Sequence, residues 1–138
     1  MPRILILLSV LLTWNTAWAA DAPAVRSEQI LHTRASWDGK PYTAYPVGQP
    51  EVSLLRITIP PHASLDWHRH PVINVGYMLS GSLEVENQET GEKNVIRAGD
   101  PLPELVGTVH RGRNPGDEAA VILVFYAGVA GSALSEKP

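Results

Sequence analysis

The first feature along the chain is an apolar run near the N-terminus. Residues 4–12 are apolar except for one serine, a positively charged arginine precedes them, and the small-x-small sequence Ala17-Trp18-Ala19 follows. This layout is typical of a secretory signal peptide, and the run is too short for a lasting membrane span. We therefore interpret residues 1–19 as a signal peptide and residues 20–138 as a single domain, and we expect a periplasmic location.

Downstream of this run, short apolar and β-branched stretches alternate with turn signals. The clusters at residues 38–41, 87–92 and 98–103 are rich in the Gly, Pro, Asn and Asp residues that end strands. The runs between such clusters predict strands at residues 27–37, 51–59, 72–79, 83–86, 94–97, 104–110 and 119–126. We expect residues 42–50 to form an extended edge, because proline cannot donate to a ladder, and residues 128–138 to fray.

The number and spacing of these strands predict the fold class. About eight short strands, with no long helical pattern and no internal repeat, favour an all-β sandwich or barrel of Greek-key or jelly-roll type. The core of the barrel is expected roughly within residues 51–127. A barrel of that size has an interior that side chains or one small ligand can fill.

Composition narrows the function classes. The 138 residues include no cysteine, which excludes disulfides, a thiolate nucleophile and a Cys-ligated zinc site. The net charge of −3 comes from scattered carboxylates, and there is no basic stripe, so nucleic acid is not an expected partner. The chain also lacks the nucleophile-elbow, phosphate-loop and dinucleotide motifs. An exported protein without cysteine fits a bacterial periplasm, where disulfides are permitted but not required.

Two histidines separated by one residue are candidate metal ligands. On a strand, His68 and His70 project from the same face, and Asn74 shares that face. His110 lies on a separate predicted strand, which a barrel can bring within a few ångströms. Imidazole is the commonest protein ligand for transition metals. Three imidazoles and one oxygen donor can hold a divalent first-row metal and leave coordination positions open for water or substrate.

At these residues the chain resembles the cupin superfamily. The first cupin motif is a Gly, five residues, His-x-His, three or four residues, Glu, six residues and Gly. Here His68-x-His70 is followed by three residues, Asn74, six residues and Gly81.

The second cupin motif is also matched in its spacing. It is a Gly, five residues, Pro-x-Gly, two residues, His, three residues and Asn. This chain carries, at the same intervals, Gly99, Leu105-Val106-Gly107, His110 and Asn114. The resemblance implies a double-stranded β-helix jelly roll, often homodimeric, with a metal held by His68, His70, Asn74 and His110.

The chain departs from the two motifs at three positions. His62 stands in place of Gly and Leu105 in place of Pro, both at turn or edge positions. Asn74 stands in place of Glu, which removes one negative charge and weakens the attraction for a divalent cation. Asn74 either ligates through its carbonyl oxygen or hydrogen-bonds a metal-bound water. Some cupins, notably thiol and diketone dioxygenases, work with three histidines, so the resemblance still implies a metal.

Further residues could contribute to the pocket. Glu104 is a candidate catalytic residue, because on a regular strand it shares the parity of His110. It could act as a general base or a replacement ligand, but we interpret it as a solvent-facing charge at the rim. Trp67, Met78 and Phe125 are candidate pocket walls.

These features lead to three functional hypotheses, of which the last is a structural or interaction domain with a vestigial site. The first is an exported metal-dependent cupin with iron or manganese, and with zinc, nickel or copper as alternatives. Its metal would bind a small molecule and either activate dioxygen or polarise a carbonyl. The second is a non-catalytic barrel that binds a small ligand or a metal at a weakened or vestigial site, since one fold hosts many functions.

Overall fold

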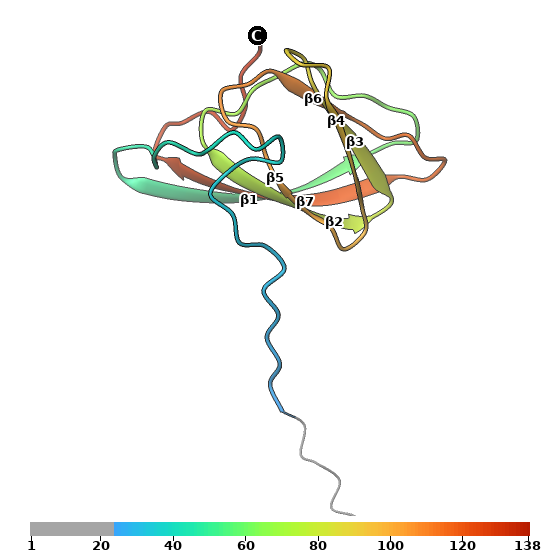
Figure 1. Ribbon diagram of the computed structural model, residues 1–138, viewed down its shortest axis with the longest axis horizontal. Coiled ribbons are helices and arrows are strands. Elements are labelled where there is room, and N and C mark those ends of the chain that lie inside the picture. The colour runs from blue at the N-terminus through green and yellow to red at the C-terminus, as the bar shows by residue number, and fades with distance from the viewer. Residues whose placement is uncertain (1–23) are drawn as a thin grey trace, which may run out of the picture.

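The computed structural model describes residues 24–138, which fold into seven strands and contain no helix (Figure 1). The strands are β1 (Pro50–Ile59), β2 (Ile73–Ser80), β3 (Ser82–Asn87), β4 (Lys93–Arg97), β5 (Pro101–Pro103), β6 (His110–Arg113) and β7 (Ala120–Val129). Within this part of the chain, nothing helical is long and apolar enough to cross a membrane. The predicted signal peptide, residues 1–19, lies outside the described residues.

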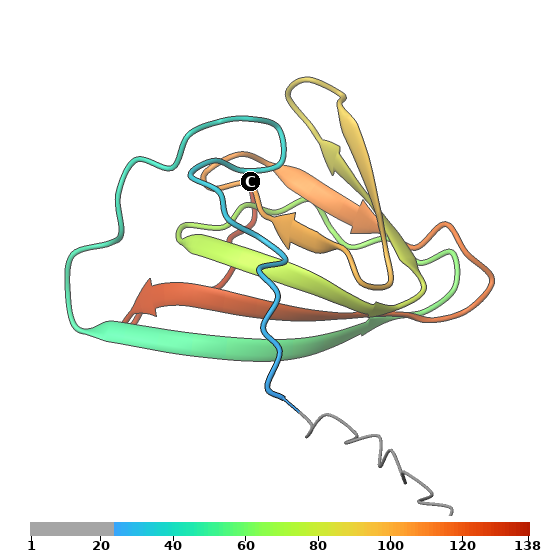
Figure 2. The ribbon, with the colours of Figure 1, turned by 60° about the horizontal axis from the view of Figure 1, so that its bottom comes forward.

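The strands form two antiparallel sheets that lie face to face (Figure 1). One sheet has the order β1-β7-β2-β5 and the other has the order β4-β3-β6. β7 pairs with β1 on one side and with β2 on the other, so these three strands run side by side (Figure 2). Strands from the start and the end of the domain are therefore neighbours, which gives the barrel its non-local contacts. The predicted all-β class is confirmed.

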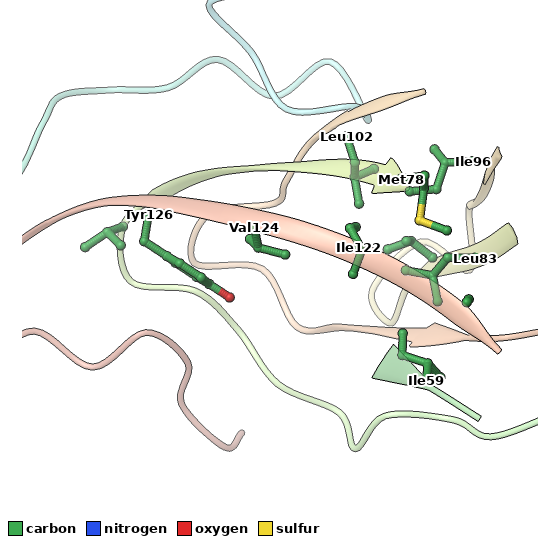
Figure 3. Close-up of a cluster of buried hydrophobic side chains, with 11 residues drawn as sticks. Ile59, Met78, Leu83, Ile96, Leu102, Ile122, Val124 and Tyr126 are labelled. Carbon is green, nitrogen blue, oxygen red and sulfur yellow. The ribbon is translucent and has the colours of Figure 1, made fainter. Parts of the chain in front are cut away.

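Side chains from both sheets fill the space between them. One buried apolar cluster comprises Ile59, Val72, Met78, Leu83, Val85, Ile96, Leu102, Ala120, Ile122, Val124 and Tyr126. Figure 3 shows Met78, Leu83 and Ile59 toward one end of this cluster and Tyr126 at the other. The ring of Tyr126 lies 5.6 Å from that of His70, so the apolar cluster closes one end of the barrel and the histidines occupy the other.

The predicted alternation of inward-facing and outward-facing side chains around β2 is confirmed. The buried positions in and just before this strand are His70, Val72, Asn74, Gly76 and Met78. The residues between them are exposed or half-buried, as the period of two requires. A Cβ atom at Gly76 would lie 2.7 Å from Cδ1 of Ile122, so a larger residue there would displace the end of the Ile122 side chain.

Residues 27–37 do not form the predicted strand. In this segment only Ala35 makes an isolated bridge, with Pro41. Most of its side chains are exposed, and Trp37 at its end packs against the core cluster. The turn predicted at residues 38–41 is confirmed, and Gly39 adopts a φ of 84° within it.

The prediction of a strand at residues 104–110 is also wrong. The chain instead forms β5 inside the cluster of turn residues at 98–103, then an irregular stretch over residues 104–109, and then β6. Gly107 has a φ of 70°, a left-handed conformation that interrupts the extended path.

The segment after β7 does not fray as predicted. Arg69 and Glu136 exchange two backbone hydrogen bonds, of 3.0 and 2.9 Å. Their side chains also pair, with 3.0 Å between Arg69 Nε and Glu136 Oε2. Residues 130–138 (the C-terminal segment) are therefore docked beside the histidines.

Candidate metal centre

Three histidines from two segments of the chain meet at the polar end of the barrel. The N–H of His68 donates to the carbonyl of His110 and the reverse, at 2.9 and 2.8 Å, so the two residues lie directly opposite each other. His70 follows on the same segment, and its carbonyl accepts a hydrogen bond of 2.8 Å from Gly107. The three rings have centroids 4.6–5.0 Å apart, and one ligand atom from each lies within 4.8 Å of the others. The structure thus brings together the three histidines that the sequence indicated.

Hydrogen bonds to the backbone fix the tautomer of each histidine. The Nδ1 atoms lie 2.7–2.8 Å from main-chain carbonyl oxygens, those of Asp66 for His68, Leu134 for His70 and Thr108 for His110. A carbonyl oxygen can only accept, so each Nδ1 carries the proton and donates it. Each Nε2 therefore keeps its lone pair, which is the state in which neutral imidazoles bind metals.

Burial keeps two of these imidazoles uncharged. Desolvation lowers the pKa of His70 and of His110 from 6.5 to about 4, although the hydrogen bonds to backbone carbonyls oppose this shift. At neutral pH both rings are therefore in the form that can ligate. No proton has to leave them for a metal to bind.

Glu104 lies inside the barrel, so its interpretation as a solvent-facing rim charge is wrong. Its exposed fraction is 7%. The pairing of β5 with β2 places Pro103 opposite Val75, and the N–H of Glu104 donates to the carbonyl of Asn74 at 3.2 Å. The carboxyl group therefore points inward on the same face as Asn74. Burial raises the pKa of Glu104 from 4.5 to about 8.

The carboxyl group of Glu104 contacts a metal-facing nitrogen. Its Oε2 lies 3.5 Å from Nε2 of His110. This contact is not an ion pair at neutral pH, because burial raises the pKa of the carboxyl group and lowers that of the imidazole, which leaves both uncharged. Neither atom has a hydrogen-bond partner among the described residues.

Asn74 is fully buried on the same face. Its Nδ2 donates to the carbonyl of Val72 at 3.2 Å, and its Oδ1 is without a partner in residues 24–138. Buried polar atoms without partners are costly and rare. Three of them are His110 Nε2, Glu104 Oε2, which lies 3.5 Å from it, and Oδ1 of Asn74, whose main chain pairs with Glu104. Nitrogen and oxygen donors without sulfur suit a divalent first-row metal, so these residues fit one; whether Asn74 itself ligates stays a prediction.

A pocket of about 420 Å³ opens beside His68 and His70. Its lining is mostly apolar and includes Trp67, Tyr126 and residues 134–137 of the C-terminal segment. The sequence did not single out Tyr126 or this segment. Alternation along β7 places Tyr126 inside, but only the register that sets it opposite Asn74 places it at the histidines.

The three residues predicted as pocket walls lie in different parts of the structure. Met78 belongs to the apolar core, and Phe125 is 43% exposed on the outer face of its sheet, so the prediction for Phe125 is wrong. Arg111 lies with its Cζ 4.3 Å from the centroid of the Trp67 ring, and its Nη2 lies 2.9 Å from Glu86 Oε2. The Arg111 guanidinium thus holds Trp67 beside the pocket.

Comparison with known proteins agrees with this geometry. The Cupin domain family matches residues 55–126, more than half of the chain. No curated protein matches the chain in sequence.

Solved structures share the fold. An uncharacterised Klebsiella pneumoniae protein with a double-stranded β-helix domain is 26% identical, with 71% of this chain and 90% of that chain covered and a TM-score of 0.53. A Cupin 2 conserved barrel domain protein from Salinispora arenicola is 20% identical, with 64% and 72% covered and a TM-score of 0.52. Oxalate oxidase in complex with the substrate analogue glycolate is 25% identical, with 56% and 42% covered and a TM-score of 0.50. The chain thus spans less than half of that oxidase. Together with the family match, the double-stranded β-helix and cupin structures confirm the predicted jelly-roll fold.

The buried groups predict how the stability of the metal-free protein depends on pH. Between about 4 and 6.5 the unfolded chain binds protons that folded His70 and His110 do not, so stability should fall as the pH drops through this range. Between 4.5 and about 8 folded Glu104 keeps a proton that the unfolded chain loses, which lowers stability as the pH rises. Below pH 6.5 the two histidines outweigh this effect, so the net stability should fall only as the pH rises above 6.5. Urea unfolding of the chelator-treated protein at several pH values should show a maximum near pH 6.5.

The Glu104→Gln variant separates the two effects. This variant should still lose stability as the pH falls below 6.5, because its histidines are unchanged. Its stability should no longer decrease between pH 6.5 and 8, because the titrating carboxyl group is absent. A wild-type protein that gains stability from pH 6.5 to 8 would contradict the assignment of the buried carboxyl group.

Proposed function

The chain belongs to the cupin family, and we propose that it binds a divalent first-row metal through His68, His70 and His110 and holds a small molecule beside it. One observation carries this proposal. Backbone carbonyls accept the Nδ1 proton of all three imidazoles and leave three Nε2 lone pairs for one ion. Iron or manganese is the proposed metal, and the donors, imidazole nitrogen and oxygen without sulfur, suit a divalent first-row metal. Zinc, nickel and copper are the alternatives.

The small molecule would occupy the pocket that His68 and His70 line. Its apolar walls suit a compact organic body, and its charged lining residues are Lys137 and the acidic Asp66 and Glu136. The oxalate oxidase neighbour is described with the substrate analogue glycolate, which supports a small oxygen-bearing acid as the ligand class. A divalent metal with an open position would polarise a coordinated oxygen or activate dioxygen.

A second candidate is a non-catalytic barrel that binds a small ligand. The observation that favours it is Asn74, which places a neutral amide where the family motif has a carboxylate. A site with one charge less attracts a divalent cation less strongly. The two candidates differ in whether the protein carries metal when it is isolated.

Elemental analysis of the protein purified without chelators tests this difference. We expect close to one equivalent of metal in the wild type and at least a tenfold loss in the His68→Ala/His70→Ala variant, because one remaining imidazole cannot hold the ion. A His32→Ala/His62→Ala variant is the matched control and should keep its metal, since both of these histidines are exposed. Equal trace metal in all three proteins, even after metal is added back, would favour the metal-free binding barrel.

We also propose that residues 1–19 direct export to the periplasm and are removed. Expression of the full sequence in a bacterial host, followed by osmotic shock and intact-mass measurement, should give a periplasmic protein that begins at Ala20. An Ala19→Arg variant should remain uncleaved, because the cleavage site requires a small residue. A full-length wild-type protein that stays in the cytoplasmic fraction would contradict export.

Finally, we propose that a second copy of the chain covers the outer face of the sheet formed by β1, β7, β2 and β5. Val52, Leu54 and Phe125 are 67%, 65% and 43% exposed on this face. Leu54 lies opposite Phe125, which lies opposite Val75, so a continuous apolar row crosses three strands. An apolar patch of this kind is self-complementary about a two-fold axis.

Light scattering coupled to size-exclusion chromatography tests the proposed dimer. The wild type should elute at twice the chain mass, and Leu54→Glu should elute as a monomer, because the dimer would bury the new charge. Val95→Glu is the control, since Val95 is 39% exposed on the other sheet and should not affect association. A monomeric wild type at micromolar concentration would contradict the proposal.

A further inference from the structure

The missing carboxylate of the first motif has a counterpart on the neighbouring strand. β5 and β2 pair antiparallel with Gly76 opposite Leu102 and Val75 opposite Pro103. The hydrogen bond from the Glu104 N–H to the Asn74 carbonyl continues this pairing by one residue. Directly opposed residues point to the same side of a sheet. Glu104 and Asn74 therefore enter the barrel from adjacent strands at the same level.

The described residues give the Glu104 carboxyl group no other role. It is buried, and its Oε2 has no hydrogen-bond partner in the described part of the chain. The nearby Tyr42 hydroxyl donates to the main-chain carbonyl of Glu104, at 3.1 Å, and not to its carboxyl group. A buried polar atom without a hydrogen-bond partner destabilises the folded state. A ligand between Glu104 and the imidazoles would remove this cost.

The distance between Glu104 and His110 fits two ligands of one ion, although Glu104 is not among the three residues whose ligand atoms all lie within 4.8 Å of one another. Metal–nitrogen and metal–oxygen bonds of about 2.1 Å place two donor atoms about 3.0 Å apart at the right angle of an octahedral site and about 3.4 Å apart at a tetrahedral angle. The observed distance from Glu104 Oε2 to His110 Nε2 is 3.5 Å. The same distance is too long for a good hydrogen bond.

We propose that Glu104 supplies a carboxylate ligand to the metal, at the coordination position that the family motif fills from residue 74. This inference rests on the proposed metal site at His68, His70 and His110. The carboxylate thus reaches the ion from β5 in place of β2. It restores the negative charge that Asn74 removes, so the centre keeps three imidazoles and one carboxylate.

Metal binding by Glu104→Gln tests the assignment. Titration of Mn²⁺ into the chelator-treated variant should give a dissociation constant about 10–100-fold higher than that of the wild type. Loss of an outer-shell partner alone already weakens metal binding by this factor. The absorption bands of the Co²⁺-loaded variant should also change, because the coordination shell changes. Glutamine has the shape of the protonated glutamate, so circular dichroism should show an unchanged fold. Glu92→Gln, at an exposed position of the β3–β4 hairpin, is the matched control and should bind as the wild type does.

The Asn74→Glu/Glu104→Gln double variant tests whether both side chains reach one position. Moving the carboxylate from β5 to β2 should bring the Mn²⁺ dissociation constant back to within about tenfold of the wild type. A double variant as weak as Glu104→Gln would overturn the shared position.

The remaining outcomes separate this inference from the function on which it rests. Glu104→Gln with wild-type Mn²⁺ affinity, or with weaker affinity but unchanged Co²⁺ bands, would overturn ligation by Glu104 and leave the three-histidine site standing. A folded wild type that binds neither ion would overturn the metal site itself.

Discussion

The candidate site depends on three hydrogen bonds in which backbone carbonyls accept an Nδ1 proton. They leave three Nε2 lone pairs free, and no other side chain is needed to orient the imidazoles. The carbonyls of Asp66 and Thr108 each precede their histidine by two residues, so the local path of the chain sets two of the bonds. The carbonyl of Leu134 comes from the far end of the domain. Closure of the barrel is therefore what completes the arrangement.

The sequence predicts the parts of this fold that depend on near neighbours. The alternation from His70 to Met78 and the turn at residues 38–41 follow from local periodicity and from glycine, and both are confirmed. The spacing of two motifs was enough to group His110 with His68. The positions of Glu104 and Tyr126 were not predictable in this way, because they depend on which strands are adjacent and in what register. The same holds for residues 130–138, whose partner Arg69 lies far away in the chain.

One alternation pattern serves two surfaces. Along β7 the side chains of Val124 and Tyr126 point into the barrel, toward the core and the histidines, whereas Phe125 between them is exposed on the outer face. A shift of one residue in the pairing of β7 would exchange these two sets. The pocket beside the histidines and the apolar outer face are thus fixed by the same register, and neither can be repositioned without the other.

The bond from His70 to the Leu134 carbonyl also determines the order of assembly. Leu134 lies downstream of every strand in the described chain. During synthesis His68, His70 and His110 are all present before the residue that orients His70 has been made. The arrangement of the three imidazoles is therefore complete only after the barrel has closed and the segment beyond β7 has docked. A metal that needs all three imidazoles would therefore be taken from the ions of the compartment in which the chain finishes folding.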